Sequence, residues 1–172
     1  MKKTAHISLC EKYRYDLSRI WDQEHNGLLY AYIGVNPSTA NASIDDATVR
    51  KWIGFTQRND GRGFIVGNVF AYRSTDVKQL ANENDPVGVQ NNWYLNQIME
   101  QADIIVPCWG SINKVPKELQ YRFDEVHRLI DTHKCKGKPV LCFGTTKNGS
   151  PKHPLMLGYN TPLIEYDIED KP

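Results

Sequence analysis

The chain has 172 residues, of which 21 are Lys or Arg and 20 are Asp or Glu, so its formal net charge is +1. This length predicts one domain, residues 1–172, and the charge balance disfavours a polybasic protein that coats nucleic acid. The four cysteines have no CxxC spacing, and Cys108 and Cys142 lie in predicted core strands, which predicts buried thiols in a reducing compartment. No apolar run reaches about 18 residues, and no apolar signal segment follows Lys2 and Lys3. We therefore expect a cytoplasmic protein with no membrane partner and no obligate protein partner.

The first predicted elements are two short strands and a longer one. Residues 5–10 and 13–21 alternate in part between apolar and polar side chains, which predicts an antiparallel hairpin at one edge of a sheet. Residues 28–35, LLYAYIGV, are continuously apolar, as in a strand that a parallel sheet buries on both faces. This run is the predicted central strand.

Asn36-Pro37-Ser38 ends the central strand. Pro37 has no amide hydrogen with which to continue a ladder, and it pushes Asn36 toward an extended conformation. Asn36 is thereby placed at the carboxyl end of the strand, where open α/β sheets bind their ligands. The alternative is an ordinary Asx-type turn, for which Asn-Pro-Ser is a common sequence.

Helices and strands alternate through the rest of the chain. Asp45 or Asp46 can cap the first helix, and Val89 and Trp93 are expected among the buried positions of the third. The predicted helices run to about residue 59 and over 77–81, 87–101 and 115–133; the predicted strands are 64–70, 103–108, 138–143 and an edge strand within 163–166. This alternation predicts an α/β fold of three layers, α/β/α, with a central, mainly parallel four-stranded sheet beside the N-terminal antiparallel hairpin.

Polar and aromatic side chains follow each predicted parallel strand, so all of them are expected at one edge of the sheet. The strand exits carry Asn36 and Ser38, Asn68 and Arg73, Trp109 and Ser111, and finally Lys147, Lys152 and His153. The chain lacks the GxxxxGK[ST], GxGxxG, GxSxG and HExxH motifs, which argues against nucleotide hydrolysis, dinucleotide redox chemistry and triad hydrolysis. We expect no metal site and no cofactor. Amides, aromatic rings, a histidine and cations suit recognition of a nucleobase and stabilisation of a departing anion.

Four segments together resemble a family of bacterial and phage proteins known as domain of unknown function 1643. They are YIGVNPSTA with the acidic pair at 45–46, then GNVFAYRSTD, the Trp109-Gly110 strand exit, and GTTKNGSPKHPL. The resemblance covers roughly residues 4–157. It implies no particular activity.

The layout is also similar to the uracil-DNA glycosylase superfamily, in which helices enclose a four-stranded parallel sheet. Residues 34–37 match the Gly-x-Asn-Pro motif of its mismatch-specific branch, and the resemblance implies that Asn36 positions the hydrolytic water. An aspartate at 45 or 46 is the alternative group for activating that water, since a carboxylate is the better base. His153-Pro154 resembles the late motif whose histidine supports the departing base anion. Leu155 stands where a serine is usual, which weakens a phosphate-gripping role and makes Leu155 a candidate wedge.

The resemblance also implies roles for the remaining strand exits, because a base in a duplex must be flipped out before it can be cleaved. Asn68 is the candidate reader of the base edge, and Phe55, Phe70 or Trp109 is the candidate stacking surface. Arg73, Lys147 and Lys152 are candidate phosphate contacts. The alternatives are that the aromatic residues belong to the core, that the aspartates only cap a helix, that Asn68 satisfies backbone groups, and that His153 and the cations are solvated surface residues.

The predicted function is a monofunctional DNA glycosylase that hydrolyses the N-glycosidic bond of a modified pyrimidine and leaves an abasic site. Residues 38–43 include no large side chain, whereas the uracil-specific branch has a bulky aromatic there that excludes substituents at C5. Ser38, Thr39, Asn41 and Ser43 are therefore expected to bind a hydroxymethyl or sugar substituent, as found in some phage DNA, with antiviral defence as the use. The alternatives are a uracil or mismatch repair glycosylase and a non-catalytic nucleotide-binding module.

Overall fold

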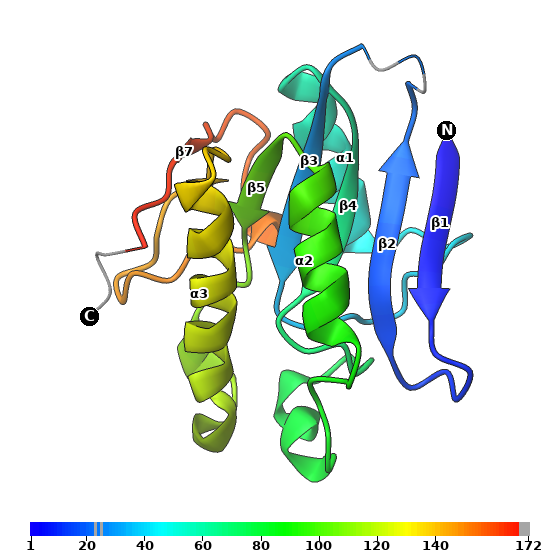
Figure 1. Ribbon diagram of the computed structural model, residues 1–172, viewed down its shortest axis with the longest axis vertical. Helices are drawn as coiled ribbons and strands as arrows, with labels where there is room; N and C mark the ends of the chain where they lie inside the picture. Colours follow the sequence, from blue (N-terminus) through cyan, green and yellow to red (C-terminus); the bar gives the residue numbers. More distant parts are fainter. Residues whose placement is uncertain (23, 25, 169–172) are drawn as a thin grey trace.

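The computed structural model describes residues 1–22, 24 and 26–168 (Figure 1). A five-stranded sheet has the order β1-β2-β4-β3-β5. β1 (Lys2–Ile7) and β2 (Arg14–Ile20) form the predicted antiparallel hairpin, and β2 is also antiparallel to β4 (Gly61–Asn68). The central strand, β3 (Leu28–Gly34), runs parallel to β4 on one side and to β5 (Ile104–Pro107) on the other.

The prediction of four parallel strands in the main sheet is wrong, because only β4, β3 and β5 are parallel neighbours there. The predicted strand 138–143 touches β5 through a single parallel bridge between Val140 and Ile105. Its remainder, β6 (Leu141–Cys142), pairs antiparallel with β7 (Ile164–Glu165), the predicted edge strand. Pro139 explains the weak pairing, since it accepts a bond from Ile105 but has no N–H to donate.

Helices cover both faces of the sheet, which confirms the mixed α/β class. α1 (Ala47–Arg58) lies on one face, where its buried side chains pack with those of β3 and β4. α2 (Asn91–Gln101) and α3 (Tyr121–Cys135) lie on the other face (Figure 1). Four short 3₁₀ helices complete the described elements: η1 (Val77–Asn82), η2 (Ile112–Lys114), η3 (Lys117–Leu119) and η4 (Pro154–Met156).

Two predicted helices begin later than expected. α2 starts at Asn91 rather than at residue 87, because residues 85–88 form a turn in which Gly88 has a φ of 86° and donates its N–H to Asp85. Val89 and Trp93 are consequently 90% and 61% exposed, so the prediction that they are buried is wrong. α3 starts at Tyr121 rather than at residue 115, and η2 and η3 precede it.

The carboxyl ends of β3 and β4 lie side by side, with Gly34 opposite Asn68 in the parallel register. The segment that leaves β3 turns back over the hairpin, where two buried arginines of β2 hold it. Arg14 donates to the carbonyl of Ala40 at 2.9 Å, and Arg19 donates to the carbonyl of Asn41 at 2.6 Å. These bonds fix the path of residues 40–45 and therefore the point at which α1 begins.

Candidate functional site

A small cavity of about 50 Å³ opens at the carboxyl ends of β3 and β4. Residues from five parts of the chain line it: Arg14 from β2; Gly34, Val35, Asn36 and Ser38 from the end of β3; Asp46, Thr48 and Trp52 from the start of α1; Asn68 from the end of β4; and His153 from the loop after β6. The cavity thus unites the three predicted catalytic residues with two predicted substrate contacts. Strand exits that are far apart in sequence meet here because β3 and β4 are parallel neighbours.

Asn36 is held in one orientation by the backbone. Its amide nitrogen, Nδ2, donates to the carbonyl oxygen of Ser74 at 2.8 Å and to that of Pro37 at 3.1 Å. Because both partners can only accept, the nitrogen must face them, and Oδ1 is the atom left for the cavity. A partly buried amide oxygen fixed in this way can accept a hydrogen bond from a water.

Asp46 both caps a helix and lines the cavity. Its Oδ1 accepts from the backbone N–H of Val49 at 2.9 Å, as in a standard N-cap, so the predicted capping role is confirmed. Only one carboxylate oxygen is used in this bond. The cap therefore also fixes the direction of the second carboxylate oxygen. Asp46 can thus cap the helix with one oxygen and act on a water with the other.

Asp45, the alternative base, is engaged outside the cavity. One of its oxygens accepts from Arg19 and the other from Lys3, each at 2.7 Å. Burial raises the pKa of Asp45, but these hydrogen bonds and charges outweigh burial and lower it. A carboxylate held by two cations is a weak proton acceptor, so Asp46 is the better candidate base.

Arg14 is a site residue that sequence reasoning missed. Its side chain is 2% exposed, and one terminal nitrogen donates to Oδ1 of Asn68 at 3.4 Å. Burial lowers the pKa of Arg14 to about 10, although the carboxylate of Asp46 acts in the opposite direction. The cation therefore persists at neutral pH beside the cavity. A charged residue in a hairpin is normally solvated, and no sequence pattern distinguishes this one.

Asn68 presents its amide nitrogen to the cavity. Its side chain is 3% exposed, and because Oδ1 accepts from Arg14, Nδ2 is directed the other way, over Gly34. Nδ2 lies 2.8 Å from the place where a Cβ on residue 34 would stand, so the amide fits only because that residue is glycine. Asn91 supports Asn68 from behind by donating to its carbonyl at 3.0 Å. Asn68 thus offers mainly a donor to a ligand.

His153 enters the cavity from the loop after β6. It caps η4, and its Nδ1 accepts from the backbone N–H of Leu155 at 3.2 Å. The neutral ring must therefore carry its proton on Nε2, which is free to act as a donor. Burial lowers the pKa of His153, and Lys114 lowers it further while Asp46 opposes both. The imidazole is consequently neutral at physiological pH.

The predicted stacking residues do not reach the cavity. Phe55 is fully buried, with its ring centroid 4.4 Å from that of Phe143. Phe70 is fully buried as well, and Trp109 is only 4% exposed and packs on Phe123. The aromatic ring at the cavity is instead Trp52. Trp52 and Phe55 are both buried residues of α1, but of these two only Trp52 lines the cavity at the strand ends.

A wider, shallower cleft of about 450 Å³ adjoins the cavity, and Ser38 lines both. Thr39 and Arg73, two further predicted contacts, line the cleft and not the cavity. Arg73 donates to the carbonyl of Glu11 at 3.1 Å, so the hairpin turn partly holds it in place. The space beyond Ser38 is therefore open, and the side chains around it are polar.

Exposed residues surround His153 on the surface. Leu155 and Met156 are 38% and 90% exposed, although both are apolar. Lys147 and Lys152 are exposed on the same loop. The predicted wedge and both predicted lysine contacts are therefore exposed residues of the segment that carries the histidine.

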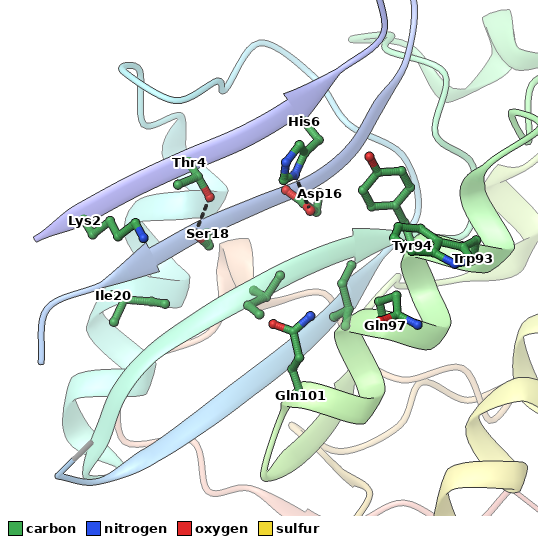
Figure 2. A pocket seen from close by; sticks show the side chains of 12 residues that line it. Lys2, Thr4, His6, Asp16, Ser18, Ile20, Trp93, Tyr94, Gln97 and Gln101 are labelled. Carbon is green, nitrogen blue, oxygen red and sulfur yellow. Dashed lines mark hydrogen bonds and ion pairs between the residues drawn. The ribbon is translucent and has the colours of Figure 1, made fainter. Parts of the chain in front are cut away.

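A second hollow of about 300 Å³ lies between the hairpin and α2, away from these strand ends (Figure 2). Four of its polar side chains form two pairs: Thr4 with Ser18 at 2.6 Å and His6 with Asp16 at 2.7 Å. Trp93 stands at one end of the hollow in Figure 2. None of the predicted site residues lies there.

Comparison with known proteins identifies the family. The family described as "Protein of unknown function (DUF1643)" matches residues 14–155. No curated protein and no solved structure matches the chain. Of the helices within residues 1–22, 24 and 26–168, none is both long and apolar enough to cross a bilayer. The same described residues include no cluster of three or more His, Cys, Asp or Glu side chains that could hold a metal ion.

Proposed function

The chain belongs to the DUF1643 family, and we propose that it is a monofunctional DNA glycosylase that removes a modified pyrimidine and leaves an abasic site. The observation that carries this proposal is the convergence of Asn36, Asp46 and His153 on one cavity at the strand ends. These residues supply the groups that hydrolysis of an N-glycosidic bond requires. The match of residues 34–37 to the Gly-x-Asn-Pro motif of the mismatch-specific uracil-DNA glycosylase branch supports the same assignment.

Asn36 and Asp46 are proposed to hold and activate the water. Oδ1 of Asn36 accepts one hydrogen of the water, and the free oxygen of Asp46 accepts the other. Neither side chain needs to reorganise, because Ser74 fixes the amide and Val49 fixes the carboxylate. A positioned general base typically contributes about 10²- to 10⁴-fold to the rate.

His153 is proposed to stabilise the leaving group. As the C1′–N bond breaks, its electron pair leaves with the base, and the oxygen of the water forms a bond to C1′. The proton of the water passes to the carboxylate of Asp46, and the base anion accepts a hydrogen bond from Nε2 of His153 before it takes a proton from solvent. A donor fixed in advance on such an anion is typically worth about 3 to 4 kcal/mol. The neutral imidazole found here carries its proton on the required atom.

Recognition of the base is assigned to Asn68, whose Nδ2 can donate to a carbonyl or ring nitrogen of a pyrimidine. The cavity itself is small, but it continues past Ser38 into the wider cleft. A substituent on C5 of the base would extend into that cleft, where Ser38, Thr39 and Arg73 can hydrogen-bond it. Asn41 is not one of these contacts, because its Oδ1 closes a turn by accepting from Ser43 and Ile44. A site of this kind favours a hydroxymethylated or glucosylated base, which suits defence against phage with modified DNA.

DNA binding is proposed to use the rim of the site. Leu155 or Met156 would fill the gap in the duplex after the base is flipped out, since both are apolar and exposed beside His153. Lys147 and Lys152 would contact phosphates. The net charge of +1 implies a local contact of this kind rather than a broad basic surface.

The proposal is tested by incubating the protein with matched duplexes that carry uracil, a thymine–guanine mismatch, hydroxymethylcytosine or glucosylated hydroxymethylcytosine. Alkali then cleaves any abasic site, and mass spectrometry identifies the released base. We expect alkali-labile strands and a free 5-substituted base. Rapid release of plain uracil without action on substituted bases would contradict the open-cleft argument, and absence of release from every duplex would contradict the glycosylase assignment.

A further inference from the structure

A separate pocket of about 300 Å³ lies beside the end of β5, between α3 and the loop that carries His153. Four aromatic side chains form much of its wall: Trp109, Tyr121, Phe123 and Tyr166. Trp109, Phe123 and Tyr166 are almost fully buried, whereas Tyr121 is 56% exposed. The pocket shares none of its lining residues with the strand-end cavity. Its volume is at the lower end of the range for small-molecule sites.

The indole N–H of Trp109 is an unused donor at this pocket. The side chain is 4% exposed, and Nε1 has no hydrogen-bond partner among the described residues. The ring cannot easily turn to find one, because it packs against Phe123 and His127 with centroid distances of 5.6 and 5.0 Å. A buried tryptophan N–H normally has a partner. A ligand that places an acceptor in the pocket would provide it.

The remaining polar groups define the charge of such a ligand. Nε2 of Gln120 donates to the carbonyls of Ile112 and Val115, so its Oε1 is the end that can accept from a ligand. Asp124 adds a carboxylate to the lining, and the lining contains no lysine and no arginine. A phosphate would find no lysine or arginine here, whereas a ring with both an acceptor and an N–H donor would be matched.

We propose that this pocket binds an uncharged, planar nitrogen heterocycle of the size of a nucleobase or nucleoside. The aromatic wall stacks on the ring, Trp109 donates to a ring nitrogen or carbonyl oxygen, and Gln120 accepts from an amino or imino group. This site is distinct from the proposed catalytic cavity and requires no reaction. Its occupancy does not depend on the glycosylase assignment.

One loop contributes to both sites. Pro151 accepts from the N–H of Gly110 at 2.9 Å, and Ser150 accepts from the N–H of Ile112 at 3.4 Å, so residues 150–151 close one side of the pocket. His153 follows two residues later and lines the strand-end cavity. The two sites are therefore neighbours across a single segment, and a binding assay must be able to tell them apart.

The indole N–H signals of the protein provide such an assay. The chain has four tryptophans, so a ¹⁵N-labelled sample should give four indole cross-peaks, and the Trp109→Phe variant identifies the peak of Trp109. We expect cytidine, uridine, adenosine or guanosine to shift that peak saturably. Trp109→Phe should weaken binding of the same nucleoside at least about tenfold, as is typical when a buried hydrogen-bond partner is lost. Trp93→Phe, on the exposed face of α2, should leave binding unchanged.

Two further binding measurements control for the charge of the ligand and for the folding of the variant. The 5′-monophosphate of the bound nucleoside should not bind more tightly than the nucleoside, because the lining has no lysine or arginine to hold the phosphate. If Trp109→Phe does not fold, Tyr121→Ala at the exposed rim should still weaken binding. A shift confined to the Trp52 peak would place the nucleoside in the strand-end cavity and overturn this proposal without affecting the glycosylase assignment. Absence of any shift at millimolar nucleoside would also overturn it.

Discussion

The strand-end cavity and the hollow beside the hairpin contain similar residue types in different arrangements. In the hollow, side chains bind one another, as in the His6–Asp16 and Thr4–Ser18 pairs. In the cavity, main-chain groups hold Asn36, Asp46 and His153 by one atom each. The second polar atom of each side chain is then fixed in direction and left for a ligand. The three side chains proposed for the chemical step are thus anchored by the backbone, whereas the paired side chains of the hollow depend on one another for their orientation.

The largest expected effect comes from Asp46→Asn. Asparagine caps helices about as well as aspartate, so the fold should persist while the carboxylate is lost. Base release should fall by roughly 10²- to 10⁴-fold, measured as single-turnover rate. Asp16→Asn is the matched control in the hollow, and its rate should equal that of the wild type. Equal losses of rate in the two variants would contradict a specific role of Asp46 in base release.

Asn36→Ala should slow release by roughly a hundredfold, as expected when a water loses its positioning group, with little change in DNA affinity. Asn41→Ala is the matched control, because Asn41 belongs to the same segment but only closes a turn. That control should lower the midpoint of thermal unfolding and leave the rate unchanged. Near-normal base release by Asn36→Ala would remove the water-positioning role.

Two substitutions separate the roles of the two ring nitrogens of His153. In His153→Asn the side-chain oxygen can still accept from Leu155, but nothing replaces Nε2. In His153→Gln the amide nitrogen can reach the place of Nε2. We expect release to slow by roughly ten- to a thousandfold in the Asn variant and less in the Gln variant, with His6→Gln in the hollow unaffected. Equal rates for both His153 variants would argue against donation from Nε2.

The lysines at the rim should act on binding rather than on chemistry. Lys147→Ala and Lys152→Ala should weaken DNA binding, and each should reduce the slope of log affinity against log salt by about 0.9, as expected for one phosphate contact. Lys136→Ala, at the end of α3, is the control. A rate loss without a change in the salt slope would instead place these lysines in the chemical step.

The smallest effect concerns pH. Burial lowers the pKa of His153 below the ordinary value of about 6.5. The folded chain therefore binds fewer protons than the unfolded chain between the two values, so this contribution to stability is complete above pH 6.5 and decreases as the pH falls below it. Urea unfolding at pH 7.5 and 5.5 should show a smaller loss for His153→Asn than for the wild type. His133, whose pKa burial also lowers, contributes equally to both. An identical loss would show that His153 is not buried as a neutral ring.

Hydrophobic pattern predicted the hairpin, the three parallel strands and the cap of α1, because each of these depends on local residues. It failed at residues 138–143, where Pro139 leaves too few donors for a full strand. It also extended α2 through Val89, since periodicity alone does not register a turn closed by Asp85 and Gly88. Local sequence does not determine which strand of the sheet another strand pairs with.

For the site, the sequence predicted the residues at the strand ends but not the residues that hold them. Asn36, Asp46, Asn68 and His153 do meet at one cavity. Arg14 was missed, because its contact with Asn68 joins positions 54 residues apart. The prediction that Trp109 stacks on a base at that cavity is wrong, because Trp109 lines the separate pocket beside α3. Such pairings follow from the order of strands in the sheet, which the sequence pattern does not specify.

The most direct measurement is the rate of base release from one duplex by three proteins: the wild type, Asp46→Asn and Asp16→Asn. The duplex carries a single 5-substituted cytosine, and alkali cleavage reports the abasic site. We expect rapid cleavage with the wild type and with Asp16→Asn, and almost none with Asp46→Asn. Cleavage by Asp46→Asn at the wild-type rate would contradict the claim that the strand-end cavity is the catalytic site.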